Sequence, residues 1–396
     1  MTRCRWGCDR LEKLKRVAIY ITLTVAVILL SLLSSSLWNG KAEKISTLSV
    51  LELNPGMTVA EFASRYNLPI DVVREVFGLR NDSERGKSVA SFGLSESELL
   101  KRTNRALALG QEYASKNWFK IPIKFALWML LLAVVFILFR KSLISGKTRI
   151  FIYGAAVALF GVLFGSDPSP MGTVKDAVVL YGKSGAVFPP RMIALTVFIL
   201  LTVGANKFIC SWGCQFGTLQ DLLFRINRNS SDTKGIFRQI RLPFVVTNGI
   251  RIVFFVFFTL MAVMYAFDAV EIIDPFKIFN PAMIGISGGI FIAMILVASP
   301  FVYRPWCHLF CPFGLVSWVF EKISLYKIQV DYDTCIACEK CAKACPSHVM
   351  GAILKRDSLI PDCFACGTCI NACPTGSVQI RRGTRALPPV NKFKKQ

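Results

Sequence analysis

Two runs of cysteines near the end of the chain limit what it can fold into more than any other feature. Each run has the form C-x2-C-x2-C-x3-C-P: Cys335, Cys338, Cys341 and Cys345 before Pro346, and Cys363, Cys366, Cys369 and Cys373 before Pro374. Two intervening residues let a loop turn around one compact object, so three thiolates of a run can reach the same cluster. The fourth thiolate must arrive from elsewhere, and the proline ends regular structure after it. The spacing therefore predicts four-thiolate [4Fe-4S] sites.

The same spacing occurs in bacterial two-cluster ferredoxins, in which the fourth cysteine of each run ligates the other run's cluster. This resemblance assigns cluster 1 to Cys335, Cys338, Cys341 and Cys373, and cluster 2 to Cys363, Cys366, Cys369 and Cys345. A structural zinc site or a disulfide framework is the alternative, although zinc ligand pairs are usually more widely separated. We expect a protein that moves single electrons.

The composition indicates a membrane protein, because 53% of the 396 residues are hydrophobic. Apolar stretches of spanning length occur at 17–38, 121–139, 150–165, 191–209, 243–267 and 283–303. The predicted fold is an α-helical integral membrane protein with about six transmembrane helices, a small extracytoplasmic helical insert and a C-terminal α+β two-cluster (2[4Fe-4S]) ferredoxin domain. We divide the chain into a basic N-terminus with the first helix (1–38), the insert (39–120), a transmembrane core (121–324), the ferredoxin domain (325–382) and a basic tail (383–396).

The formal net charge of +22 is explained by orientation, because Lys and Arg collect in cytoplasmic loops. Basic residues precede the first span and fill the loops at 140–149 and 225–241, whereas the loop at 268–282 has only Lys277. We therefore expect a multi-pass protein of a bacterial inner membrane, with both termini cytoplasmic and residues 39–120 extracytoplasmic. The lipid bilayer is then the expected partner of the apolar surface, and nucleic acid is not needed.

The insert contains helix signals of its own. Thr58 and Glu61 form a capping box that opens a helix through Tyr66, and a second helix at 71–77 ends at Gly78. A further helical stretch covers 95–118. The pair looks like a helix-turn-helix, but a packing or partner-docking module fits a segment outside the cell membrane better.

A second cysteine pattern is repeated within the predicted core. Residues 207–217 (KFICSWGCQFG) and 304–314 (RPWCHLFCPFG) share the form basic-x2-C-x3-C-x-F-G, and an Asp-Pro loop precedes each, at Asp167 and Asp274. Packed as neighbours, the two units could offer four thiolates to one site: Cys210, Cys214, Cys307 and Cys311. That site could hold a further iron–sulfur cluster or another soft metal, act as a thiol–disulfide relay, or consist of reduced cysteines that only pack. Cys4 and Cys8 form a third pair of the same spacing.

A multi-span protein with inner C-x3-C motifs and a C-terminal two-cluster ferredoxin resembles the NapH/NosR/CcoG family of membrane-anchored polyferredoxins. The resemblance covers about 151–382 and is strongest at 210–217, 307–314 and the two ferredoxin runs. It implies electron exchange between the (mena)quinone pool and a redox partner, with quinol oxidation for a periplasmic reductase as the role of the NapH type. Gln215 stands where the family has proline, and the insert has no flavin-attachment signature, so the terminal substrate does not carry over.

Quinol oxidation also releases protons, which need an acceptor. Asp167 and Asp274 are the acidic residues repeated at equivalent places, although Asp before Pro is also a common turn initiator. Of the two histidines, His308 lies inside a cysteine pair and could be a ligand, whereas His348 follows a cluster cysteine. Three tryptophans are expected to be anchors at the membrane surface: Trp212, Trp306 and Trp318.

The leading hypothesis is a membrane-bound iron–sulfur electron-transfer protein, a quinol dehydrogenase-type subunit that works with partner redox subunits. The alternative is a copper-handling or assembly factor of the CcoG type, but the chain lacks the Met-rich or His-rich tracts that copper traffic favours. A membrane-anchored redox sensor is a third hypothesis.

Overall fold

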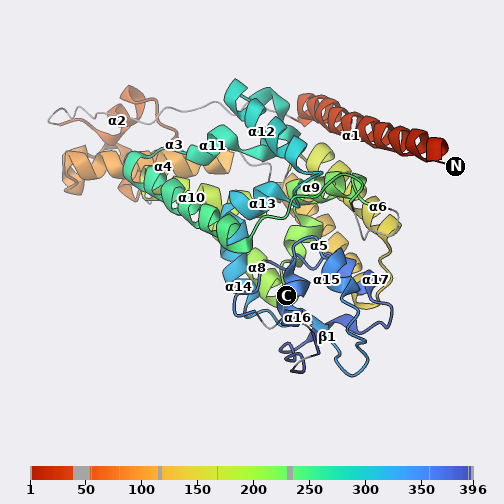
Figure 1. Cartoon of the computed structure of the whole chain (residues 1–396). Coiled ribbons are helices and arrows are strands. Elements are labelled where there is room, and N and C mark those ends of the chain that lie inside the picture. The colour runs from red at the N-terminus through yellow and green to blue at the C-terminus, as the bar shows by residue number, and fades with distance from the viewer. Residues whose placement is uncertain are drawn as a thin grey trace.

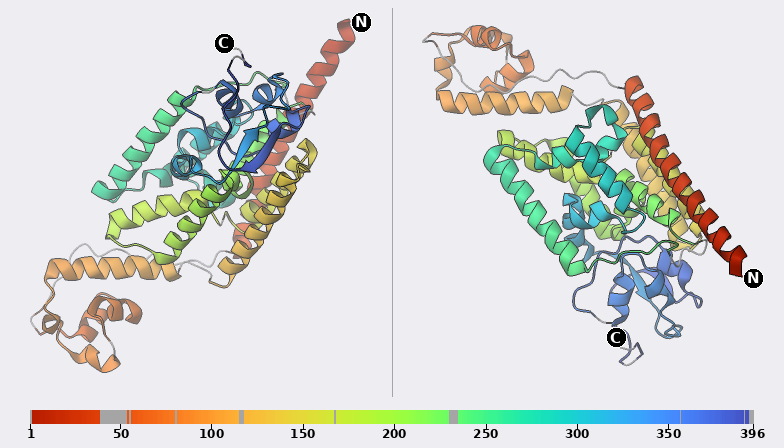
Figure 2. Two further views of the ribbon diagram at one scale, coloured as in Figure 1. Left: turned by 90° about the horizontal axis from the view of Figure 1, so that it is seen from below. Right: turned by 45° about the horizontal axis from the view of Figure 1, so that its top comes forward.

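The computed structural model describes residues 2–38, 54, 56–79, 81–114, 118–166, 168–229, 235–355, 357–390 and 392–393. This described part is mostly helical and contains one two-stranded sheet. The insert and the C-terminal cysteine-rich head (326–382) lie at opposite ends of the molecule, with the apolar helices between them (Figures 1 and 2). The predicted order of insert, core and head along the chain is therefore also their order in space.

The described part of the insert is a small helical unit with its own apolar core, which includes Phe62 and Leu99. It consists of α2 (Val59–Arg65), α3 (Ile70–Phe77), the 3-10 turns η1 (Asp82–Gly86) and η2 (Val89–Phe92), and α4 (Glu96–Ala114). Thr58 and Glu61 form the capping box at the start of α2, and Gly78 ends α3 with a left-handed φ of 63°. The first two predicted helices of the insert are thus confirmed, and the third, predicted at 95–118, is a helix from Glu96 to Ala114.

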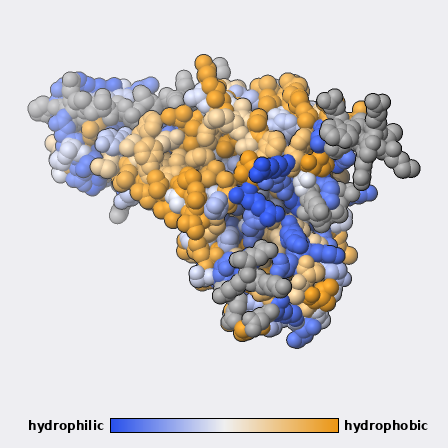
Figure 3. All heavy atoms as spheres, in the orientation of Figure 1, coloured by the Kyte–Doolittle hydropathy of each residue, from blue (hydrophilic) through white to orange (hydrophobic). Residues whose placement is uncertain are grey.

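Four helices in the described part are long and apolar enough to cross a membrane. They are α1 (Thr2–Trp38), α5 (Lys120–Arg140), α6 (Gly146–Ala156) continued by the π-helical η3 (Val157–Leu163), and α10 (Phe244–Tyr265). Two shorter apolar helices, α8 (Pro189–Ala205) and α12 (Ile286–Ala298), occupy the other predicted stretches. These helices are compatible with a membrane protein, and Figure 3 shows apolar residues gathered over the middle of the molecule, between the polar insert and the polar head.

The core consists of two units in the same order as the sequence repeat. In the first unit, α6 and η3 are followed by α7 (Pro170–Ser184), α8, η4 (Ile209–Gly213) and α9 (Gln215–Ile226). In the second, α10 is followed by α11 (Ala269–Ile273), η5 (Pro275–Phe279), η6 (Pro281–Met283), α12, α13 (Pro305–Leu309) and α14 (Pro312–Glu321). The first motif (207–217) therefore leads into α9, and the second motif (304–314) leads into α14.

Three arginines that were counted above as loop charges are buried. Arg149 lies in α6, Arg225 lies in α9, and Arg228 comes just after the end of α9. Their exposed fractions are 0%, 4% and 4%, respectively. Arg228 donates from Nη2 to the carbonyl oxygen of Ala344 in the head at 2.9 Å. Part of the positive charge therefore holds the head against the core instead of marking a loop.

The head contains three short helices and the sheet. The helices are α15 (Lys340–Ala344), α16 (Val349–Lys355) and α17 (Thr368–Ala372), and the strands are β1 (Tyr326–Val330) and β2 (Val378–Arg382). The strands are antiparallel, and Ile328 pairs with Ile380. The sheet joins the two ends of the head, so the cysteine loops lie between strands that are fixed to each other.

Candidate functional site

The loops of the two ferredoxin runs have the same backbone conformation. Ala337 and Glu339 in the first run have φ values of 54° and 53°, and the equivalent Ala365 and Gly367 in the second run have 49° and 80°. Left-handed backbone is unfavourable for residues other than glycine and persists where the surroundings require it. The two left-handed residues turn each loop twice between its first and third cysteine. The cysteine spacing predicts such turns for a chain that encloses a compact group.

The structure brings together the four thiols predicted for cluster 1. Burial and then the thiols of Cys373, Cys335 and Cys338 raise the pKa of Cys341 to about 12. Cys373 comes from the other run, as the crossed pattern requires. Burial alone would raise the pKa of Cys373, but hydrogen bonds from Thr375 and from nearby backbone N–H groups lower it. Such hydrogen bonds to sulfur stabilise thiolate ligands.

The four thiols predicted for cluster 2 are also neighbours. Burial raises the pKa of Cys369 well above its usual value, and the thiols of Cys345, Cys366 and Cys363 raise it further. Three of these four cysteines are buried, whereas in the cluster 1 set only Cys341 is. The cluster 2 set is therefore the inner one of the two, and the cluster 1 set lies closer to the surface.

The described residues contain no candidate site for a single metal ion: no group of three or more His, Cys, Asp or Glu among them is close enough to hold one ion. The [4Fe-4S] prediction for both sets rests on the cysteine spacing of the two runs. Which cysteine ligates which cluster stays a prediction.

A buried carboxylate docks the cluster 2 loop on the core. Asp362 directly precedes Cys363 and is fully buried, and it forms ion pairs with Lys207 and with Arg251, the latter at 3.0 Å. Lys207 opens the first motif, and Arg251 belongs to α10. Burial alone would raise the pKa of Asp362, but these two cations hold it well below its usual range. The head is therefore fixed to the core by charge next to a cluster cysteine.

Further polar contacts hold the same loop. Trp212 of the first motif donates from Nε1 to the carbonyl oxygen of Ala365 at 3.1 Å. Arg149 and Arg225 each donate to the hydroxyl of Thr368 at 3.2 Å. These contacts come from α6, η4 and α9, so the cluster 2 loop lies directly against the first unit of the core.

The two motifs also hold each other. Lys207 of the first motif donates from Nζ to the carbonyl oxygen of Gly314 in the second, at 2.8 Å. Arg304 of the second motif donates from Nη1 to the carbonyl oxygen of Cys210 in the first, at 2.5 Å, and pairs with Asp221 of α9 at 2.7 Å. The basic residue that opens each motif thus binds the backbone of the other.

The glycine that ends each motif is required by close packing. A Cβ on Gly217 would lie 2.8 Å from the carbonyl oxygen of Cys210, and one on Gly314 would lie 2.8 Å from that of Cys307. Real Cβ atoms do not approach backbone so closely, so both positions need glycine. The matching contacts show that the two motifs fold alike.

The four cysteines of the motifs meet in the interior, and we call them the four-cysteine site. Burial raises the pKa of Cys311 well above its usual value, and the thiols of Cys307, Cys214 and Cys210 raise it further. The N–H group of Gly314 donates to Cys311 Sγ at 3.3 Å. The structure thus unites the pairs that the repeat suggested, although it leaves their ligand untested.

The charge balance around these thiols favours an anionic group. Six buried cations surround the four-cysteine site and the cluster 2 set: Arg149, Lys207, Arg225, Arg228, Arg251 and Arg304. The buried carboxylates described there are Asp221, Asp362 and Glu321, and burial raises the pKa of Glu321 to about 7. Buried charge without compensation is costly, and a thiolate-ligated iron–sulfur cluster is anionic. The residues present therefore fit an anionic iron–sulfur cluster at the four-cysteine site and at the cluster 2 set.

Asp274, one of the two predicted proton acceptors, takes part in local contacts. Asp274 accepts from the N–H group of Phe276 at 3.0 Å and lies 3.1 Å from Lys175 Nζ. It therefore starts a turn, which was the alternative interpretation of an Asp-Pro pair. Asp167 and the side chains of Cys4 and Cys8 lie outside the part of the chain that the structure describes.

The structure also places two of the tryptophans and His308 differently from what the sequence predicted. Trp212 and Trp306 are 0% and 1% exposed, so the expectation that they anchor the membrane surface is wrong. His308 has its Nδ1 atom 3.2 Å from the carbonyl oxygen of Arg304, and its ring packs on Phe364 of the cluster 2 loop. It therefore covers the head–core junction.

Sequence reasoning missed the residues that join the head to the core. Lys207 and Arg304 occupy the first position of the repeated motif, so the repeat itself could have singled them out. Asp362 and Arg251 are separated by 111 residues, and neither belongs to a local pattern. Their pairing appears only in the fold.

If the fourth cysteine of each run ligates the other run's cluster, variants of cysteines from different runs should have the same EPR spectrum. Cys345→Ser and Cys363→Ser, from different runs, are both expected to remove cluster 2 and to leave the same EPR spectrum. Cys373→Ser and Cys335→Ser are expected to share the other spectrum, because both belong to the cluster 1 set. EPR spectroscopy of the four reduced proteins checks this. Grouping of the spectra by run, with Cys335 and Cys345 variants alike, would contradict it.

Family models match three parts of the chain. The model of a 4Fe-4S dicluster domain matches residues 327–374, which hold both ferredoxin runs. The model of a 4Fe-4S binding domain matches residues 187–231 and again 284–329, which hold the two C-x3-C motifs. The double match supports the duplication of the core unit.

Three curated relatives are similar to parts of the chain. "Putative electron transport protein YccM" of Escherichia coli K12 is 28% identical over 180 residues, covering 42% of this chain and 49% of that protein. Two uncharacterized proteins of Methanocaldococcus jannaschii are 24% and 25% identical, covering 40% and 51% of this chain and 58% and 80% of their own lengths. The matched region thus spans about half the length of the first two relatives. No solved structure matches. The matches to 4Fe-4S domain models indicate that both the head and the two C-x3-C units belong to iron–sulfur binding domains.

Proposed function

We propose that the chain exchanges electrons between a membrane quinone and a redox partner. The observation that carries this proposal is a continuous series of contacts from an apolar cavity in the core, through the four-cysteine site, to the head. Iron–sulfur clusters bound at the cysteines would supply one-electron redox chemistry. The protein then positions the cysteine sets, keeps water away from the inner ones and binds the quinone.

The cavity has a volume of about 150 Å3 and lies between α5, α7 and α8. Rings and other apolar groups form most of its wall, among them Trp118, Phe125, Phe188 and Phe198. Asp176 and Arg191 add an ion pair of 3.2 Å at the same cavity. An apolar cavity with a few polar groups is the usual form of a small-molecule site. Asp176 is then a carboxylate at the cavity itself that could accept a proton from a quinol, in addition to the predicted Asp167 and Asp274.

The cavity adjoins the four-cysteine site. Pro168 lines it, and the carbonyl oxygen of Pro168 accepts a hydrogen bond of 2.9 Å from Gln215, the residue after Cys214. Phe198, which also lines it, packs edge-on against Phe313 of the second motif, with ring centroids 6.3 Å apart. Gln215, where the resembling family has proline, therefore links the cavity wall to the motif.

We further propose that the four-cysteine site holds a third iron–sulfur cluster. Its buried thiols, the N–H group that Gly314 directs at Cys311, and the surplus of buried cations support this over simple packing. The cysteine sets then lie in the order four-cysteine site, cluster 2 set and cluster 1 set, with the last nearest the surface and a redox partner.

Filling the cavity tests the quinone proposal. Gly172 lines it, and a Cβ there would meet only side-chain atoms at 3.5 Å or more, so Gly172→Leu is expected to fold. We expect reduction by a menaquinol analogue, in protein reconstituted into nanodiscs, to slow by about tenfold or more, while reduction by dithionite is unchanged. The matched control is Gly154→Leu in α6, where nothing lies within 4 Å of the added Cβ. Equal quinol rates for both variants and the parent protein would refute the site.

A further inference from the structure

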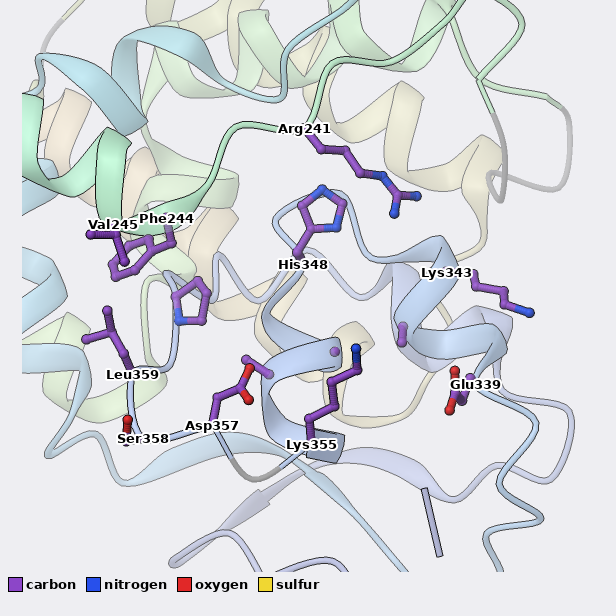
Figure 4. A pocket seen from close by; sticks show the side chains of 14 residues that line it. Arg241, Phe244, Val245, Glu339, Lys343, His348, Lys355, Asp357, Ser358 and Leu359 are labelled. Carbon is purple, nitrogen blue, oxygen red and sulfur yellow. The ribbon is translucent and has the colours of Figure 1, made fainter. Parts of the chain in front are cut away.

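A wide pocket opens where the head meets the start of α10. It has a volume of about 690 Å3, and Figure 4 shows the side chains that line it. Residues of α15, α16 and the loop at 357–361 form the side that belongs to the head, and Arg241, Phe244 and Val245 form the side that belongs to the core. The pocket is separate from the quinone cavity and from both cluster sets.

Cations gather at this pocket and at the hollow beside it. Arg241, Lys343 and Lys355 line it, and an adjoining hollow of about 920 Å3 shares the first two and adds Arg238 and Lys340. None of these five cations forms an ion pair with a residue that the structure describes. Like charges held at one opening repel each other, so a bound anion would stabilise the arrangement.

The acidic and titratable groups at the pocket do not cancel this charge. Glu339 and Asp357 are the carboxylates that line it. Burial, followed by Arg241 and Arg228, lowers the pKa of His348 to about 4, so His348 adds no charge near neutral pH. The pocket therefore presents a net positive charge to a ligand.

The opposite side of the pocket is apolar. Figure 4 shows Phe244, Val245 and Leu359 together, away from the ammonium group of Lys343 and the guanidinium group of Arg241. Val245 is 70% exposed. Exposed valines continue along α10 from this point, with Val246 53%, Val253 69% and Val256 50% exposed. A cationic opening thus runs directly into an exposed apolar helix face.

We propose that this pocket binds an anionic phospholipid, with the phosphate among Arg241, Lys343 and Lys355 and the acyl chains along α10. The inference rests on the proposed function at a membrane quinone, in which α10, long and apolar enough to cross a membrane, lies in the bilayer. Basic pockets at the cytoplasmic ends of membrane helices bind anionic lipid headgroups in this way. A free phosphate or an acidic protein would use the cations but not the apolar face, which is why the combination favours a lipid. The lipid then holds the head on the membrane surface beside α15, which carries Cys341.

The test uses the full chain purified in mild detergent and stripped of lipid. We expect phosphatidylglycerol to bind at least about tenfold more tightly than phosphatidylcholine, measured by native mass spectrometry and by the shift in thermal unfolding. The double variant K343Q/K355Q is expected to weaken phosphatidylglycerol binding about thirtyfold. The reason is that each cation near a membrane surface contributes roughly fivefold in affinity, and the variant removes two. The matched control is R381Q/R382Q on β2, which removes two exposed charges at a distance from the pocket and is expected to bind as the parent does.

Three outcomes overturn the proposal. The first is equal binding of the two lipids, and the second is unchanged binding by K343Q/K355Q. The third is stabilisation by millimolar inorganic phosphate equal to that by phosphatidylglycerol, which would assign the pocket to a free anion. If the chain is recovered in the soluble fraction, α10 does not lie in a bilayer and the lipid proposal fails as well. None of these measurements depends on quinol oxidation. Failure of the lipid site is therefore distinguishable from failure of the proposed redox function.

Discussion

Asp362→Asn is expected to loosen the head from the core and to lower the iron content. Asp362 compensates two cations, Lys207 and Arg251, which are 0% and 1% exposed, and the variant leaves both without that charge. Removal of one partner from a buried pair costs roughly 3–5 kcal/mol. Because Cys363 is the next residue, the cluster 2 loop is expected to lose its position as the pair breaks. Thermal unfolding and the iron and acid-labile sulfide content of the purified protein measure both effects.

The control for this prediction is a carboxylate of the same head that makes a surface contact. Asp331 lies 3.7 Å from Arg381 with both side chains partly exposed, and surface pairs contribute about 0–1 kcal/mol. Asp331→Asn is therefore expected to leave the unfolding temperature and the iron content close to those of the parent. Asp362→Asn with the same stability and iron content as Asp331→Asn would show that the buried pair does not fix the head.

Replacing the four-cysteine site is expected to remove a third of the bound iron. The parent is expected to bind about twelve iron atoms per chain and the variant with Ser at Cys210, Cys214, Cys307 and Cys311 about eight. The reason is that only the two cluster sets of the head remain in the variant. Quinol-driven reduction should be lost at the same time, whereas dithionite should still reduce the clusters of the head. Iron, sulfide and copper analysis, with EPR spectroscopy, gives the readout.

The comparison variant keeps the four-cysteine site and removes a head cysteine. Cys373→Ser is expected to lose the cluster 1 signal without changing the thiols of the core. About eight iron atoms in the parent protein would contradict a third cluster. Copper that is present in the parent and lost from the four-serine variant would instead favour the metal-handling alternative.

The parts of the fold that sequence predicted are those with local signals. The capping box of Thr58 and Glu61 and the left-handed Gly78 involve residues within a few positions of each other, and the structure has them as expected. The ferredoxin loops are similar, because cysteine spacing fixes where the chain must turn. The six apolar stretches were predicted by hydropathy alone, yet α8 and α12 are shorter than predicted. Each ends at a local signal inside its predicted stretch, at Asn206-Lys207 and at Ser299-Pro300.

The parts that sequence did not predict depend on long-range contacts. Helix α7 (Pro170–Ser184) lies between two predicted spans and carries Lys175, Asp176 and Lys183, yet Lys175 is only 6% exposed. Its charge is held by Asp274 and Glu271, about a hundred residues away. In the same way Arg225 seemed to be a cytoplasmic loop charge until α9 placed it beside Asp221 and Thr368. Because charged residues are usually exposed, their burial can be predicted only when the residue that pairs with them is known.

The reciprocal contacts of Lys207 and Arg304 have the logic of a symmetric dimer. In an isologous interface residue i of one subunit contacts residue j of the other, and j contacts i in return. Here the basic residue of each motif contacts the backbone of the other, although the acceptors differ: Gly314 ends the second motif, and Cys210 is the first cysteine of the first. One polypeptide thus contains an approximate form of such a pair. Each cysteine motif receives a backbone contact from the basic residue of the other half. A change of the basic residue in one half therefore acts first on the loop of the other half.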